Sequence, residues 1–233
     1  MLEDAWNGTG QFEGTEPIRG FGAVAGVYEE ACQIVVRADS EISTVEELEG
    51  HRVSVGEEES GTKQNALQIL AAYGLNEKLV EEVSLNYTEA AKELENGTID
   101  AFFCTAGVQT AAITNLAQRT GIRFLNVDSA AAARLKKSYP VYDSCIIAAG
   151  TYPGQEEDVS TVGVKAVLLA SDSVSAEVVE ELTALLFEEQ QELDFALPVE
   201  LITDADAAVA GISVPFHKGA ERYYESRGEK SEN

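Results

Sequence analysis

The run RVSVGEEESGT, residues 52–62, decides the fold. Its opening residues, 52–55, carry two valines in alternation and predict a short β-strand. The small and polar residues that follow Gly56 predict a turn. From residue 63 to residue 73 apolar side chains recur at helical spacing, and Gly74 marks the end of that helix. A strand that passes through a turn directly into a helix is typical of an α/β protein.

The same alternation of strands and helices continues on both sides of this run. Toward the amino terminus we expect an extended segment over residues 23–36 and a short helix that ends at Gly50. Further strands are expected at residues 83–86, 100–104, 123–127, 144–149 and 162–170. Further helices are expected at residues 88–95, from about 107 to 118, and at 129–138, 175–193 and 218–227. Because the strands are short, apolar and separated by helices, we expect parallel α/β sheets.

No long linker or compositional break divides the chain. Two lobes joined by extended crossings near residues 28–37 and 142–150 would explain why no boundary is visible. We therefore expect lobe 1 to consist of residues 1–37 and 146–233, and lobe 2 of residues 38–145.

Composition narrows the classes of partner. The formal charge of −25 arises from 41 acidic and 16 basic residues, and such a polyanion repels phosphate backbones and anionic membrane surfaces. We expect no nucleic-acid partner and attribute the acidity to solubility. Apolar residues make up 45% of the chain, but no run approaches the roughly 18 apolar residues that cross a bilayer.

Signatures of catalysis are scarce. The two histidines, His51 and His217, lie next to glycine or proline turns, where a surface or turn residue is more common than a base. The motifs of zinc proteases, α/β-hydrolases, phosphate loops and dinucleotide folds do not occur, and no cysteine or histidine pair has zinc-ligand spacing. We expect no enzyme, no cofactor and no metal, and we expect Cys104 and Cys145, which lie in apolar runs, to be buried and inert.

One catalytic motif does match. Ser60 and Lys63 have the S-x-x-K spacing of penicillin-binding serine hydrolases. That chemistry also needs S-D-N and K-T-G elements, and neither occurs in this chain. A pattern with two fixed positions arises often by chance, so we interpret the match as incidental.

The same segment has a second interpretation, as a binding site. The opening amides of the helix that starts near Thr62 have no intrahelical partner, and the hydroxyls of Ser60 and Thr62 lie beside them. Residues 105–107 occupy the equivalent place after the strand at 100–104. Both loops follow parallel strands, where α/β sheets bind ligands. The residues alone leave two possibilities open: a site for a carboxylate or similar anion, or hydroxyls that only cap a helix.

Four segments resemble one known family, the TAXI-type solute-binding proteins of TRAP transporters, whose members are also called immunogenic proteins. These segments are VSVG with SGT at residues 53–56 and 60–62, IDAFF with AG at 99–103 and 106–107, AGTYPGQ at 149–155, and VPFHKGAERYY at 214–224. Together they span nearly the whole chain, and AGTYPGQ is the most specific of them.

The resemblance implies a type II periplasmic-binding-protein fold, in which two α/β lobes close on a small solute. It implies a carboxylate-bearing solute such as glutamate or glutamine, which the loaded protein delivers to membrane subunits from the periplasm or the extracytoplasmic face, where a lipoprotein anchor would fit. The ligand-binding residues that it implies are Ser60, Gly61, Thr62, Ala106 and Gly107 on one wall, with Tyr28 and Tyr152 at the crossings.

The chain departs from the family pattern in two places. Glu59 stands where the family has glycine, which adds negative charge beside the predicted anion site and favours a ligand with a cationic part. The chain also opens at a point that resembles the interior of lobe 1, so we expect that lobe to be incomplete at its amino terminus. An incomplete lobe exposes apolar surface and an unpaired sheet edge, which predicts a homodimer or weak stability.

Two other functions stay open. An enzyme on the same fold would need a base or nucleophile with a perturbed pKa, and only Ser60 and acidic side chains are candidates. A cytoplasmic ligand-sensing domain would share the architecture, and a DNA-binding segment upstream would favour it.

Overall fold

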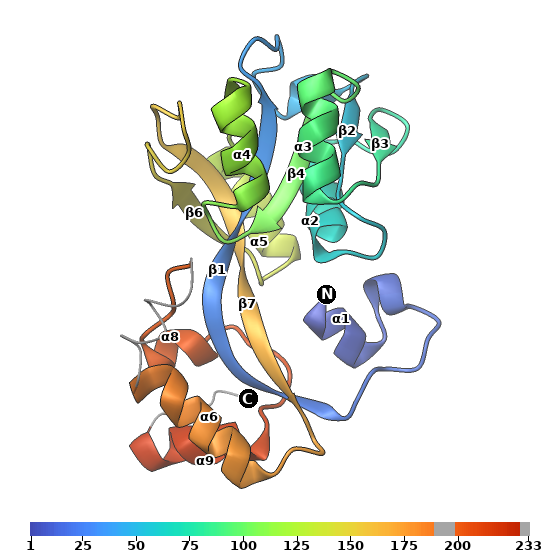
Figure 1. Cartoon of the computed structure of the whole chain (residues 1–233). Coiled ribbons are helices and arrows are strands. Elements are labelled where there is room, and N and C mark those ends of the chain that lie inside the picture. The colour runs from blue at the N-terminus through green and yellow to red at the C-terminus, as the bar shows by residue number, and fades with distance from the viewer. Residues whose placement is uncertain (189–198, 229–233) are drawn as a thin grey trace. The chain divides into compact units, whose positions relative to one another are not determined.

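The computed structural model describes residues 1–188 and 199–228 (Figure 1). The chain forms two compact units: unit 1 consists of Met1–Glu29 and Lys165–Asn233, and unit 2 of Glu30–Val164. Two long strands, β1 (Phe21–Arg37) and β7 (Val159–Ser171), each contribute residues to both units. The mixed α/β fold class predicted from the sequence is confirmed.

Unit 2 is built on a sheet with the strand order β3-β2-β4-β1-β7-β6, in which β5 also pairs with β1. The remaining strands are β2 (Arg52–Ser54), β3 (Glu81–Val83), β4 (Ala101–Ala106), β5 (Ile122–Phe124) and β6 (Asp143–Ile147). The prediction of a parallel sheet was only partly right. Strand β2 is parallel to β3 and β4, but β1 is antiparallel to β4 and β5, and β6 is antiparallel to β7. A short strand buried on both faces has the same apolar pattern in either direction, so the pattern could not reveal the reversal.

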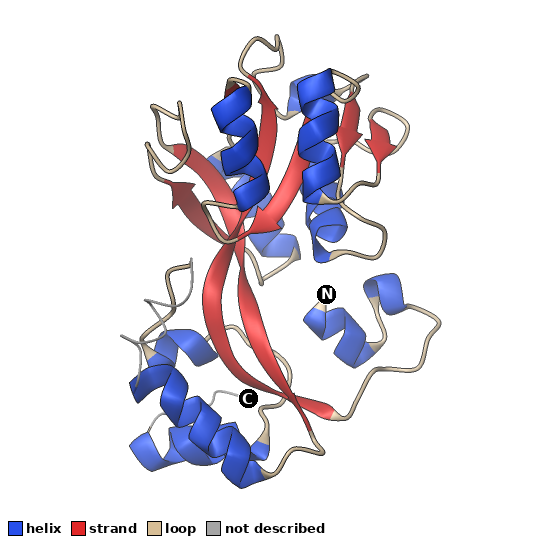
Figure 2. Cartoon of the chain, in the orientation of Figure 1, coloured by secondary structure: helices blue, strands red, loops and turns tan. Residues whose placement is uncertain are grey.

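Helices cover both faces of this sheet (Figure 2). Helices α2 (Gly61–Ala72) and α5 (Ser129–Ser138) share one apolar core, while α3 (Tyr87–Asn96) and α4 (Ala111–Arg119) share the other. The alternation of strand side chains fixes this division: Ile34 belongs to the first core and Val35 to the second. A 3-10 turn, η2 (Glu46–Leu48), stands where a short helix was expected.

Unit 1 has its own core, in which α6 (Ala176–Glu188) and α9 (Lys218–Arg227) pack with the first half of β1. Gly219 sets the spacing of these helices, since a Cβ atom there would lie 2.3 Å from the carbonyl oxygen of Ala176. The Tyr224 hydroxyl donates a hydrogen bond of 2.8 Å to the carbonyl of Val24 and ties α9 to β1. The motif at residues 214–224 is therefore largely architectural.

Three elements of unit 1 were not anticipated: α1 (Leu2–Asn7), the 3-10 turn η1 (Gly10–Phe12) and α8 (Ala205–Val209). Each is too short for helical periodicity to be recognised. Helix α6 was expected to run to residue 193, and its last predicted turn lies outside the described residues. Among the helices of the described ranges, none has the length and apolar character needed to cross a bilayer.

Candidate functional site

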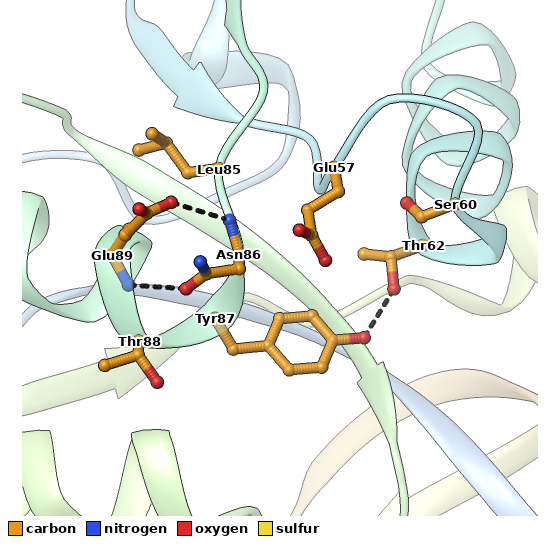
Figure 3. Close-up of a pocket in the computed structure, with 8 residues that line it drawn as sticks. All are labelled: Glu57, Ser60, Thr62, Leu85, Asn86, Tyr87, Thr88 and Glu89. Carbon is orange, nitrogen blue, oxygen red and sulfur yellow. Dashed lines mark hydrogen bonds between the residues drawn. The ribbon is translucent and has the colours of Figure 1, made fainter.

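A cavity of about 550 Å³ lies in unit 2 at the carboxyl ends of β2 and β3 (Figure 3). One side of it is the loop that joins β2 to α2, and the other is the first turn of α3. Its lining residues are Glu57, Ser60, Thr62, Leu85, Asn86, Tyr87, Thr88 and Glu89. The N-terminal ends of two helices therefore meet at one cavity.

The loop after β2 is shaped by backbone that favours glycine. Gly56 has φ +100°, and a Cβ atom there would lie 2.9 Å from the side chain of Thr62. Glu59 has φ 61°, an uncommon conformation for a residue with a side chain. Glycine adopts this conformation without steric cost, so the glutamate at this position strains the loop. Ser60 then caps α2, since its side chain accepts a hydrogen bond of 3.1 Å from the amide of Lys63.

The other side of the cavity is a capping box at the start of α3. The Asn86 side chain accepts a 2.9 Å hydrogen bond from the amide of Glu89, and the Glu89 carboxylate accepts one of 3.4 Å from the amide of Asn86. The reciprocal pair fixes where the chain enters the helix. Thr88, in the same turn, is exposed to the cavity.

A chain of part-buried hydrogen bonds joins the two sides. The Tyr87 hydroxyl donates a hydrogen bond of 2.8 Å to the carbonyl of Thr105 on β4. Because its one proton is used there, the Thr62 hydroxyl, 2.5 Å away, is the donor to Tyr87. Thr62 is only 5% exposed. Burial raises the pKa of Tyr87 to about 12, and the carbonyl of Thr105, which can only accept, fixes the direction of the relay.

The charge at the cavity is negative. Glu57 and Glu89 line it, and none of its lining residues is basic. Lys63, in the first turn of α2, lies 2.7 Å from the carboxylate of Glu58, and this contact, followed by the Ser84 hydroxyl, lowers the pKa of Glu58. The ammonium group of Lys63 thus forms an ion pair with the carboxylate of Glu58.

The predicted binding residues other than Tyr152 fall into three places. Ser60 and Thr62 line the cavity with Gly61 between them, whereas Ala106 and Gly107 lie at the end of β4, outside its lining. Tyr28 lies on the part of β1 that belongs to unit 1 and is half-buried there. The structure brings together the first three residues, and the role of the others stays a prediction.

Tyr152 has a clear structural role in unit 2. It is 2% exposed, and its hydroxyl donates to the Gln33 side chain at 2.5 Å and accepts from the amide of Thr110 at 3.0 Å. Gln33 and Thr110 also hydrogen-bond to each other, at 3.2 Å. The side-chain amide of Gln155 donates to three backbone carbonyls of the same region. The Tyr152 contacts hold the loop that follows β4, and the Gln155 contacts hold the AGTYPGQ segment itself.

Glu57 and the turn Asn86–Glu89 were missed as site residues. The chain did carry a signal for the turn, because Asn followed three positions later by Glu is capping-box spacing. What the pattern could not give was the adjacency of β2 and β3, which places the two helix starts side by side.

The residues considered for catalysis have structural roles. Ser60 and Lys63 are not arranged as nucleophile and base, since the Lys63 ammonium group contacts Glu58 and Ser84. His217 is buried and caps α9, while His51 lies 3.2 Å from the carboxylate of Asp100 near the surface.

The two cysteines considered from the sequence differ in burial. Burial raises the pKa of the Cys104 thiol to about 12, as an inert buried residue requires, whereas Cys145 is half-buried and not buried as expected. Within residues 1–188 and 199–228, no group of three or more histidine, cysteine or acidic side chains could hold a metal ion.

Comparison with known proteins gives one family and several structures. The chain matches the NMT1-like family over residues 1–228. It is similar to the periplasmic aliphatic sulphonate binding protein SsuA from Escherichia coli, with 18% identity, 76% of this chain and 53% of that chain covered, and a TM-score of 0.44. A TctC solute binding protein from Polaromonas is 18% identical, with 76% of this chain and 59% of that chain covered and a TM-score of 0.45. An ancestral arginine-binding protein bound to glutamine is 16% identical, with 74% of this chain and 60% of that chain covered and a TM-score of 0.40. This chain spans 53–60% of the length of these three proteins.

Proposed function

We propose, from the premise that the chain belongs to the NMT1-like family, that it is a solute-binding protein of the type II periplasmic fold and not an enzyme. The cavity in unit 2 takes up part of a small solute. The motif resemblance at residues 53–62, 99–107, 149–155 and 214–224 supports the finer assignment to a TAXI-type TRAP transporter. In that role the protein works outside the cytoplasm and passes its solute to membrane subunits.

One observation carries this proposal: two helices, α2 and α3, begin at the same cavity. The first amides of each helix have no intrahelical acceptor, and the helix dipoles add partial positive charge at both ends. Side-chain caps satisfy the amides of Lys63 and Glu89 only. The earlier amides can therefore bind a carboxylate, which supports a solute such as glutamate or glutamine.

Thermal unfolding with a panel of amino acids and small organic acids tests the proposal. A solute at about 100 times its Kd stabilises the folded protein by about 2.7 kcal/mol. For a chain of this size we expect a Tm rise of roughly 5–10 °C.

Two variants localise the binding. Thr88→Tyr places a large side chain in the cavity and is expected to abolish the Tm rise. Ser129→Tyr makes a similar change at the exposed first turn of α5, away from the cavity, and is expected to leave the rise intact. A panel without any Tm rise would refute the proposed function. An unchanged rise in Thr88→Tyr would move the site away from this cavity.

A further inference from the structure

Strand β6 forms an open edge of the sheet in unit 2. It stands last in the strand order, and within the described residues it pairs only with β7 (Figure 1). Ile146, on this strand, is 66% exposed, the highest value among the large apolar side chains of the described chain. An unpaired strand that carries an exposed apolar side chain is a template for pairing with another strand.

The hydrogen bonds of β7 show which backbone groups of β6 face this open edge. Ser160 of β7 lies opposite Ile146. Its amide donates to the Asn126 side chain at 2.7 Å, and its carbonyl accepts from the amide of Val127 at 2.9 Å, so both groups point away from β6. In an antiparallel pair, opposite residues either bond to each other or both point outward. The amide and carbonyl of Ile146 therefore face the open edge and, by alternation, so do those of Ser144.

From this edge we infer that two copies of the chain form a dimer by pairing β6 with β6 in antiparallel orientation, with the twofold axis at Cys145. In this register Ser144 of each copy lies opposite Ile146 of the other. Each of these pairs exchanges two hydrogen bonds, so the outward backbone groups of both residues gain partners. The two Ile146 side chains lie diagonally on the same face of the joined sheet, within reach of each other.

The charges at the two ends of β6 fit a second copy of this chain. Helix α5 ends with two lysines, and Lys136 forms an ion pair with Asp143 at the start of β6. The loop that follows β6 carries three consecutive acidic residues, 156–158, and Asp158 accepts a hydrogen bond of 2.8 Å from the amide of Ala149, just past the end of the strand. Antiparallel self-pairing brings the basic end of each copy to the acidic end of the other. The net charge of −25 opposes association, and this local match offsets part of that repulsion.

The size of the edge sets the strength of the dimer. Strand β6 has five residues and is about 17 Å long, so it buries less surface than a standard interface. We expect a reversible dimer with a Kd on the order of 10–100 µM. Sedimentation velocity of the whole chain across this concentration range should show a monomer that converts to a dimer.

Ile146→Pro tests the backbone pairing directly. Proline removes the amide that faces the open edge, and because that amide does not bond to β7, the pairing of β6 with β7 is kept. We expect this variant to stay monomeric throughout the range, with the Tm of the wild type when both are measured below the Kd. Ile146→Val is the matched control, because it keeps the amide and a β-branched apolar side chain, and it should dimerise like the wild type.

Oxidative cross-linking tests the register. At the axis the two Cys145 residues form a non-hydrogen-bonded pair with Cα atoms about 4.5 Å apart, which a disulfide can span. Copper phenanthroline in air should oxidise the two thiols to a disulfide, with oxygen as the electron acceptor, and give a dimer on a non-reducing gel. Cys145→Ser should remove the dimer band, since Cys32 and Cys104 are buried. The double variant Cys145→Ser, Ser160→Cys is the control for random collision, because it moves the thiol to an exposed position on β7, away from the open edge.

Three outcomes would overturn the inference. The first is a wild-type protein that stays monomeric across the range. The second is a dimer that Ile146→Pro leaves intact, which would place the interface elsewhere, as in the dimer expected from an incomplete lobe 1. The third is cross-linking through Ser160→Cys as efficient as that through Cys145. None of these outcomes depends on whether a solute binds, so the proposed function is tested separately.

Discussion

Replacement of Tyr87 by phenylalanine tests the hydrogen-bond relay beneath the cavity. The change removes one oxygen atom, which accepts from Thr62 at 2.5 Å and donates to the carbonyl of Thr105 at 2.8 Å. Thr62 and Thr105 are only 5% and 8% exposed, although Thr62 also lines the cavity, so water replaces the lost contacts only in part. A buried polar group left without a partner costs about 1–3 kcal/mol. Since the Thr62 hydroxyl can rotate toward another acceptor, we expect a total loss of about 2–3 kcal/mol.

Urea unfolding followed by circular dichroism measures this loss as a decrease in the transition midpoint at an unchanged m-value. Tyr139→Phe is the matched control, because Tyr139 is 41% exposed and its loss of a hydroxyl should change stability by less than about 0.5 kcal/mol. Thr62→Val keeps the shape of Thr62 and leaves the Tyr87 bond to Thr105 in place, so it should cost about 1 kcal/mol. A Tyr87→Phe variant as stable as the wild type would refute the relay, and additive effects in the double variant would show that Thr62 and Tyr87 are not coupled.

Three further predictions concern the backbone, the helix pair and alkaline pH. Glu59→Gly should stabilise the protein by about 0.5–1 kcal/mol in urea unfolding, because φ 61° disfavours a residue with a Cβ atom. Glu59→Ala, which also removes the carboxylate but keeps a Cβ atom, should not. Gly219→Ala should destabilise the protein by about 1–3 kcal/mol, since its Cβ atom would lie 2.3 Å from the carbonyl oxygen of Ala176; an unchanged Tm would contradict the close approach of α6 and α9. Burial raises the pKa values of Tyr87 and Cys104 to about 12 in the folded protein, above their unfolded values, so the unfolded state loses these protons first. Stability should therefore be intact below the unfolded pKa values and decrease as pH rises toward 12, and Tyr87→Phe should show a smaller decrease.

Much of the secondary structure could be predicted because its signals are local. The helix over residues 129–138 and that over 218–227 have the bounds expected from apolar spacing and flanking turns. The start of α2 was expected near Thr62, and Ser60 does cap it. Each of these features depends on side chains within one or two helical turns.

The direction of the strands and the shape of the cavity depend on contacts between distant residues. The antiparallel register of β1 with β4, such as Ile34 opposite Phe103, leaves no trace in either strand alone. The pairing of β2 with β3 brings Asn86 to the same cavity as Ser60, although neither segment identifies the other. The hydroxyl of Tyr152 bonds to Gln33, 119 positions away, and no local pattern indicates that contact.

The way in which the chain enters and leaves unit 2 constrains how the protein is made. Unit 2 is one continuous segment, residues 30–164, inserted between the two parts of unit 1. During synthesis its core is therefore complete before Lys165 has left the ribosome. The first 29 residues, which include the apolar start of β1, have to wait for partners such as Phe216 and Tyr224. At about 5–20 residues per second this interval lasts on the order of ten seconds or more. A chaperone that shields short apolar segments would act on residues 1–29 at this stage.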